Sequence, residues 1–111
     1  MKTKLTKEQV LRILAQELPY LRERFGVVRV ALYGSIAQET ATTRSDVDLL
    51  VELSRPLGLE FVTLAQYLER RLGRSVDLAT FETLRRSLQH PRYRAIAQNI
   101  AGTLVDVETA A

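Results

Sequence analysis

The sequence predicts one α/β (α+β) domain in which helices alternate with the strands of a small sheet. Three observations support this prediction. The N-terminal segment carries apolar residues at helical spacing, three later runs are short and rich in β-branched residues, and a length of 111 residues suits one hydrophobic core. We therefore expect residues 1–111 to form a single domain.

The first half of the chain alternates helical and strand patterns. Thr6 opens a capping-box pattern, and apolar residues then recur every three or four positions, so we expect a helix over residues 7–24. The run VVRVALY predicts a strand over residues 27–33. The segment SIAQETA is long enough for a short helix, and a polar loop then leads to a second strand over residues 46–53.

The second half continues the alternation. We expect a helix over residues 58–72, which ends before Gly73, and a short third strand over residues 75–80. Pro91 opens a last helix, and residues 106–111 read as a frayed tail. The apolar residues that share one face of this last helix, and that we expect to face the core or a partner, are Tyr93, Ile96, Ala97, Ile100, Ala101 and Leu104.

Composition excludes several classes of protein. The absence of cysteine excludes disulfides and thiolate metal sites, and the charged N-terminal segment resembles neither a signal peptide nor a membrane span, so we expect a cytoplasmic protein. The net charge is +3, and arginines gather in ERRLGR and RRSLQHPRYR. Neither stretch interleaves aromatic residues as a single-strand binder would, which favours a solvated face over direct binding of nucleic acid. An acidic protein partner or a triphosphate is compatible with both stretches.

Three aspartates interrupt strands that are otherwise made for burial. Side chains alternate along a strand, so Asp46 and Asp48 point to one face while Val47 and its alternate neighbours point to the other. Asp77 interrupts the third strand in the same way, and the three carboxylates form one cluster if that strand lies beside the second. Like charges held so close repel unless a cation separates them, and hard oxygen ligands suit Mg²⁺ or Mn²⁺. Such a cluster can support an in-line phosphoryl displacement.

A Gly-Ser pair follows the first strand. Gly34 allows backbone to approach a phosphate closely, Ser35 adds a hydroxyl donor, and the amides of the following short helix point toward the anion. The tail of a nucleoside triphosphate is therefore the expected ligand at this turn.

In its Gly-Ser pair and its three strand aspartates, the sequence resembles the minimal nucleotidyltransferase (MNT) domains of the DNA polymerase β superfamily. The resemblance rests on LYGSIAQETATTRSDVDLLVEL followed by SVDLAT, within residues 27–80. It implies a polymerase β-like fold with a small mixed sheet packed against helices. It also implies that Asp46, Asp48 and Asp77 bind Mg²⁺, that Asp77 helps to activate the attacking hydroxyl, and that Gly34 and Ser35 hold the triphosphate of ATP.

The resemblance further implies a partner. Small stand-alone members of this family are typically antitoxins that pair with a HEPN ribonuclease toxin, and some transfer AMP from ATP to a tyrosine of that toxin. Two alternatives remain open: neutralisation of the toxin by binding alone, and nucleotidyl transfer to a small molecule such as an aminoglycoside. A homo-oligomer and a hetero-oligomer with the toxin are both compatible with the sequence.

The chain departs from the family pattern at one point. Where the family commonly has Arg-Gly after the alanine of the Gly-Ser motif, this chain has Gln38 and Glu39. The carboxylate of Glu39 either weakens the phosphate cradle or faces solvent from the short helix.

Two further interpretations are structural: His90 sits in a capping loop, and Tyr93 belongs to core or interface and does not stack on a nucleotide.

Overall fold

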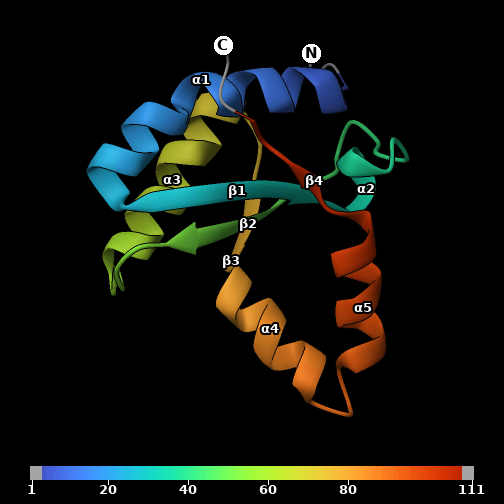
Figure 1. Cartoon of the computed structure of the whole chain (residues 1–111). Helices are drawn as coiled ribbons and strands as arrows, with labels where there is room; N and C mark the ends of the chain where they lie inside the picture. Colours follow the sequence, from blue (N-terminus) through green and yellow to red (C-terminus); the bar gives the residue numbers. More distant parts are fainter. Residues whose placement is uncertain (1–3, 109–111) are drawn as a thin grey trace.

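The structure is a computed structural model that describes residues 4–108. Helices and strands alternate along the chain, which confirms the predicted α/β class (Figure 1). Within residues 4–108, no helix is both long and apolar enough to cross a membrane. In chain order the elements are α1 (Lys7–Phe25), β1 (Val27–Tyr33), α2 (Gly34–Ala37), β2 (Val47–Leu53), α3 (Glu60–Leu72), β3 (Val76–Thr80), α4 (Phe81–Gln89), α5 (Arg94–Thr103) and β4 (Val105–Asp106).

The four strands form one mixed sheet in the order β3-β2-β1-β4. β1 runs antiparallel to both β2 and β4, whereas β2 and β3 run parallel to each other. The parallel pair is joined by α3, which supplies the crossover that parallel strands require. The mixed sheet that the resemblance implied is confirmed, and the third strand does lie beside the second.

Helices cover both faces of the sheet, and the hydrophobic core on one face is larger than the core on the other (Figure 1). The larger core packs α1 and α3 against one face, where Val30, Leu32 and Leu49 are fully buried. The smaller core packs α4 and α5 against the other face. Its buried members are Ala31, Leu50, Phe81, Leu84 and Ala97.

Helix ends follow the predicted signals. The Thr6 backbone amide donates to Gln9 Oε1 at 2.9 Å, and the Gln9 amide donates to Thr6 Oγ1 at 3.1 Å, so the capping box that opens α1 is confirmed. α1 ends at Gly26 and α3 ends at Gly73, with φ of 71° and 68°. This left-handed conformation favours glycine, which has no Cβ to clash with the backbone.

Two elements were absent from the sequence prediction. α4 was missed, although Thr80 caps it by accepting a hydrogen bond from the Thr83 amide and its apolar residues have helical spacing. β4 was missed because only two residues pair with β1. The predicted tail is therefore wrong at residues 106 and 107: Asp106 lies in β4, and Val107 is buried with its amide donating to the Val30 carbonyl. Residues 109–111 lie outside the described part.

The last helix buries less of its apolar face than the sequence predicted. Of the six residues on that face, only Ala97 is buried. Ile96 is 65% exposed and Tyr93 is 48% exposed, because α5 packs mainly against α4 and makes few contacts with the sheet. The expectation of a core stripe is therefore corrected to a partly open surface.

Candidate active site

Three polar side chains form a row across the sheet. Tyr33 at the end of β1 is the register partner of Asp48 on β2, and Asp48 is in turn the partner of Asp77 on β3. Partners in register point to the same face of a sheet, and here that face is the one covered by α4 and α5. Pairing of β2 with β3 thus brings together two of the predicted carboxylates.

Strand alternation places these groups as the sequence predicted. Val47, Leu49 and Val51 are fully buried against α1 and α3, which fixes the register of β2 and leaves Asp48 half-buried on the opposite face. Asp46 lies one residue before the strand begins and is exposed, as is Asp77. The two aspartates of the D-x-D pair therefore differ in their access to water.

The carboxylates repel one another. Burial raises the pKa of Asp48, and the negative charges of Asp77 and Asp46 raise it further, so all three groups are electrostatically coupled. Burial, together with Asp77 and Asp48, also raises the pKa of Tyr33 to about 12. At neutral pH Tyr33 is therefore a protonated phenol, and it lies beside carboxylates that repel one another.

Gly34 packs directly on this row. Its φ is +76°, and a Cβ built on it would stand 2.2 Å from Asp48 Oδ2, which is far inside van der Waals contact. The position therefore requires glycine for two reasons: the left-handed backbone and the carboxylate that occupies the space of a side chain. Ser35 follows, half-buried, and its hydroxyl makes no hydrogen bond with any residue in the range 4–108. Of the two predicted cradle residues, Gly34 thus borders Asp48 and Ser35 is the next residue in the chain.

The donor set suits a hard divalent cation. Carboxylate oxygens are the ligands that Mg²⁺ prefers, and a cation would relieve the repulsion that raises the pKa of Asp48. Among residues 4–108, however, no group of three or more His, Cys, Asp or Glu side chains is close enough to hold a metal ion in this conformation. Binding a cation between Asp46, Asp48 and Asp77 therefore requires their side chains to converge.

Gln38 and Glu39, where the chain departs from the family pattern, are both exposed. Glu39 is exposed and lines a hollow beside Lys4 and Lys7 near the start of α1. Its φ is 62°, so the backbone keeps a conformation typical of glycine although the residue is not glycine. Of the two interpretations, the structure favours the one in which this anion faces solvent.

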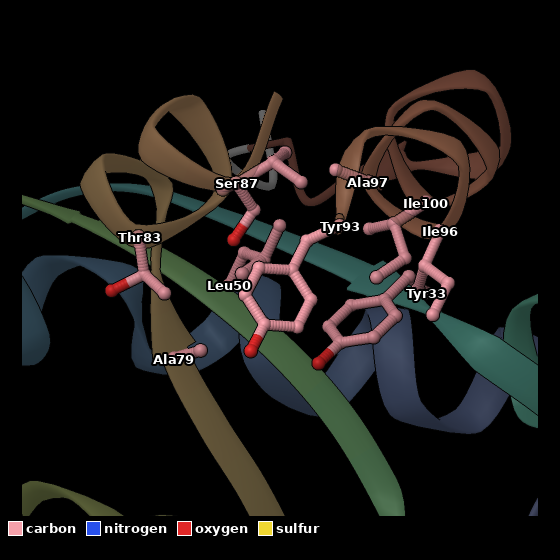
Figure 2. A pocket seen from close by; sticks show the side chains of 10 residues that line it. Tyr33, Leu50, Ala79, Thr83, Ser87, Tyr93, Ile96, Ala97 and Ile100 are labelled. Atoms are coloured by element: carbon pink, nitrogen blue, oxygen red, sulfur yellow. The ribbon is translucent and has the colours of Figure 1, made fainter. Parts of the chain in front are cut away.

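A pocket of about 230 Å³ adjoins the row and was missed by the sequence analysis (Figure 2). Its floor comes from Leu50 and Ala79, two residues beyond Asp48 and Asp77 on the same strands. Its walls come from α4 and α5, and Tyr33 stands at its border with the carboxylates. The helical spacing of residues 81–88 was the one signal in the sequence that indicated such a wall.

The chain is similar in sequence to known nucleotidyltransferases. The family model described as "Nucleotidyltransferase domain" matches residues 14–101, most of the chain. Protein adenylyltransferase MntA of Thermococcus cleftensis is 42% identical over 82 residues, which cover 73% of this chain and 83% of that protein.

Solved structures share the fold. A proposed minimal nucleotidyltransferase superposes with a TM-score of 0.67 at 29% identity, covering 93% of this chain and 97% of the other. A chain in the complex of a tri-AMPylated Shewanella oneidensis HEPN toxin with an MNT antitoxin superposes with a TM-score of 0.51 at 17% identity, covering 94% of this chain and 70% of the other. At that identity the likeness shows the fold alone.

Proposed function

The chain belongs to the nucleotidyltransferase domain family, and from this premise we propose that it is a Mg²⁺-dependent protein adenylyltransferase that transfers AMP from ATP to a tyrosine of a cognate HEPN-family toxin. Residues 1–111 would act as one minimal nucleotidyltransferase domain. The observation that carries the proposal is the contact of Gly34 with Asp48, which is in register with Asp77. The proposed phosphate cradle and two carboxylates thereby lie together at one end of the strands.

The roles of the residues follow from their places. Gly34 carries no side chain, so the Asp48 carboxylate packs directly on the backbone of the turn that we propose for the triphosphate, and the unengaged Ser35 hydroxyl can donate to a phosphate oxygen. Asp46, Asp48 and Asp77 supply oxygen ligands for Mg²⁺ or Mn²⁺, which when bound neutralises the triphosphate and stabilises charge that develops during displacement. Asp77, exposed on the edge strand, is accessible to an incoming hydroxyl and accepts its proton.

The reaction balances without a further reactant. The tyrosine oxygen forms a bond to the α-phosphorus of ATP, the bond between that phosphorus and the bridging oxygen to the β-phosphate breaks, and pyrophosphate leaves with its electron pair. The phenolic proton passes to Asp77 and then to solvent. The product is an AMP–tyrosine phosphodiester.

The relative from Thermococcus cleftensis, a protein adenylyltransferase that shares 42% identity over most of both chains, supports a protein as the acceptor. The exposed apolar residues of α5 offer a surface for such a partner, since Ile96 is 65% exposed. The proposal therefore places the acceptor tyrosine on a separate protein chain.

The test is label transfer to a purified HEPN-family protein encoded beside this chain. With Mg²⁺ and ATP labelled at the α-phosphate, we expect label on the partner, and with ATP labelled at the γ-phosphate we expect none. Asp48→Asn should abolish transfer. The matched control is Asp106→Asn, which removes a carboxylate from β4, where it pairs with Arg29 at 2.8 Å, outside the row.

Two results would contradict the proposal. Label that persists in Asp48→Asn means that this carboxylate does not serve the reaction. Neutralisation of the partner without nucleotide, unchanged by Asp48→Asn, means that the protein acts by binding alone.

A further inference from the structure

The pocket beside the carboxylate row has the position of a substrate subsite. Leu50 and Ala79 of its floor lie two residues from Asp48 and Asp77 on the same face, a distance of about 7 Å along a strand. The gap between α4 and α5 opens above this floor (Figure 2). A ligand whose reacting atom is at the carboxylates can therefore extend directly into the pocket.

The lining is apolar and uncharged, with a few unengaged hydroxyls. None of its residues is Asp, Glu, Lys, Arg or His, so the pocket does not suit a phosphate. The hydroxyls of Tyr33, Ser87 and Tyr93 form no hydrogen bond with any group of residues 4–108. In Figure 2 the two tyrosine hydroxyls point in the same direction. These hydroxyl groups can donate hydrogen bonds to, and accept them from, the polar edge of a bound ligand.

Tyr93 contributes an aromatic ring to the pocket lining. It is 48% exposed, its ring centroid lies 4.9 Å from that of His90, and the Arg92 guanidinium lies 6.0 Å from its ring centroid, so its neighbours in the chain hold the ring at the start of α5. Tyr33 contributes a second ring from the end of β1. Aromatic faces of this kind stack on flat ring systems.

We propose that this pocket holds the nucleobase of the ATP whose phosphates lie against Gly34. The inference rests on the proposed function, of which it specifies the substrate contacts. At about 230 Å³ the pocket is smaller than sites that enclose a whole drug-sized ligand, so it fits one ring system and leaves the ribose and phosphates outside. A base has both a flat face for the tyrosines and a polar edge for the hydroxyls.

The competing occupant is the acceptor tyrosine. A phenol has one polar atom, and that atom must stand at the carboxylates to react. The Ser87 and Tyr93 hydroxyls would then face only ring carbons. The number of unengaged hydroxyls therefore favours a base. Tyr93, which the sequence assigned to core or interface, becomes a stacking residue.

Equilibrium binding tests the proposal with two probes, ATP and inorganic tripolyphosphate, each in the presence of Mg²⁺. The wild-type chain should bind ATP more tightly than tripolyphosphate. Tyr93→Ala should weaken ATP binding about 5- to 100-fold, which corresponds to the loss of one aromatic–base stack, and leave tripolyphosphate binding unchanged. Tyr93→Phe keeps the ring and should retain most of the affinity.

Two further variants complete the design. Ala79→Leu fills the floor of the pocket and should weaken ATP binding selectively, which covers the case in which Tyr93→Ala does not fold. Val62→Ala removes an exposed apolar side chain of α3 that does not line the pocket, and should change neither affinity. Circular dichroism of each variant reports whether it is folded.

Three outcomes overturn the inference. If both folded pocket variants weaken ATP and tripolyphosphate equally, the pocket does not distinguish a base. If they leave ATP binding unchanged but raise the KM for the acceptor protein, the pocket holds the acceptor ring. If wild-type protein binds tripolyphosphate as tightly as ATP, the protein binds the phosphates but makes no favourable contact with the base. If it binds neither probe, the proposed function is wrong as well.

Discussion

Substitution of Gly34 by alanine tests the central contact of the site. The added Cβ would stand 2.2 Å from Asp48 Oδ2 and 3.0 Å from its Cγ, on a backbone with φ of +76°. Two costs therefore combine: a left-handed conformation imposed on a residue with a side chain, and overlap with the carboxylate.

The two costs can be estimated separately. A left-handed alanine costs about 1–2 kcal/mol, of which about 0.4–1 kcal/mol is offset because alanine reduces the entropy of the unfolded chain. Overpacking adds about 1–3 kcal/mol. We expect Gly34→Ala to lower the free energy of unfolding by about 2–4 kcal/mol and the Tm by about 8–16 °C, at about 4 °C for each kcal/mol in a domain of this size.

Gly73→Ala is the matched control. Gly73 has φ of +68° but no atom within 4 Å of its added Cβ, so it carries the backbone cost alone, about 1 kcal/mol. Urea unfolding of Gly34→Ala, Gly73→Ala, Asp48→Ala and the double variant Gly34→Ala/Asp48→Ala gives the coupling between Gly34 and Asp48. We expect this coupling to be about 1–3 kcal/mol, since Asp48→Ala removes the atoms that the Cβ overlaps.

The reasoning is refuted if Gly34→Ala costs no more than Gly73→Ala, or if the double-mutant coupling is zero. Either result means that the Asp48 carboxylate does not pack on Gly34 in solution.

Three further predictions follow from charges and backbone geometry. Burial and the neighbouring carboxylates raise the pKa of Asp48, so its ionised form destabilises the fold. Without divalent metal, Asp48→Asn should therefore raise the Tm at pH 7, and this gain should vanish below the ordinary pKa of aspartate, where Asp48 is protonated in both the folded and the unfolded state. A lower Tm of the variant at pH 7 would contradict this prediction. Glu39→Gly should relieve the strain of the left-handed backbone, whose φ is 62°, and raise the free energy of unfolding by about 0.5 kcal/mol, whereas Glu39→Ala should not raise it. Equal free energies of unfolding for the two variants in urea would show that the strain is absent. The hydrogen bond from Arg29 lowers the pKa of Asp106, so the stability that this pair supplies is full at neutral pH and is lost as pH falls through that lowered value. Arg29→Gln should cost about 1 kcal/mol more at pH 7 than at a pH below that value, where it removes only the contact of the guanidinium with the Phe81 ring, 4.2 Å from the ring centroid. An equal cost at both pH values would exclude the ion pair as its cause.

The part of the site that depends on local pattern could be predicted from the sequence. The alternation of Val47, Asp48 and Leu49 is a property of any half-buried strand, so it placed the carboxylate on a face opposite the larger core. Gly34 and its left-handed backbone likewise follow from the turn that ends β1. The proximity of Asp77 to Asp48 could be predicted only on the condition that β3 pairs with β2, because this pairing is a long-range contact that no local spacing specifies.

The part that depends on tertiary packing could not be predicted. The pocket joins Tyr33 and Leu50 to residues that follow them by 29 positions or more along the chain, and only the folded sheet brings them together. α4 was missed because its arginines were interpreted as a solvated surface, which they do form, while Phe81 and Leu84 on its other face are buried. The orientation of Glu39 was also undetermined, because the sequence did not show that α2 ends at Ala37 and leaves Glu39 beyond the helix.

The most direct test of the account is the mass of the partner protein after incubation with this chain, ATP and Mg²⁺. We expect an increase equal to one or more AMP groups, located on tyrosine by peptide fragmentation, and no increase with Asp48→Asn although that variant is folded. An unmodified partner, or the same increase with Asp48→Asn, would contradict the claim that the row of Asp48 and Asp77 beside Gly34 is the site of nucleotidyl transfer.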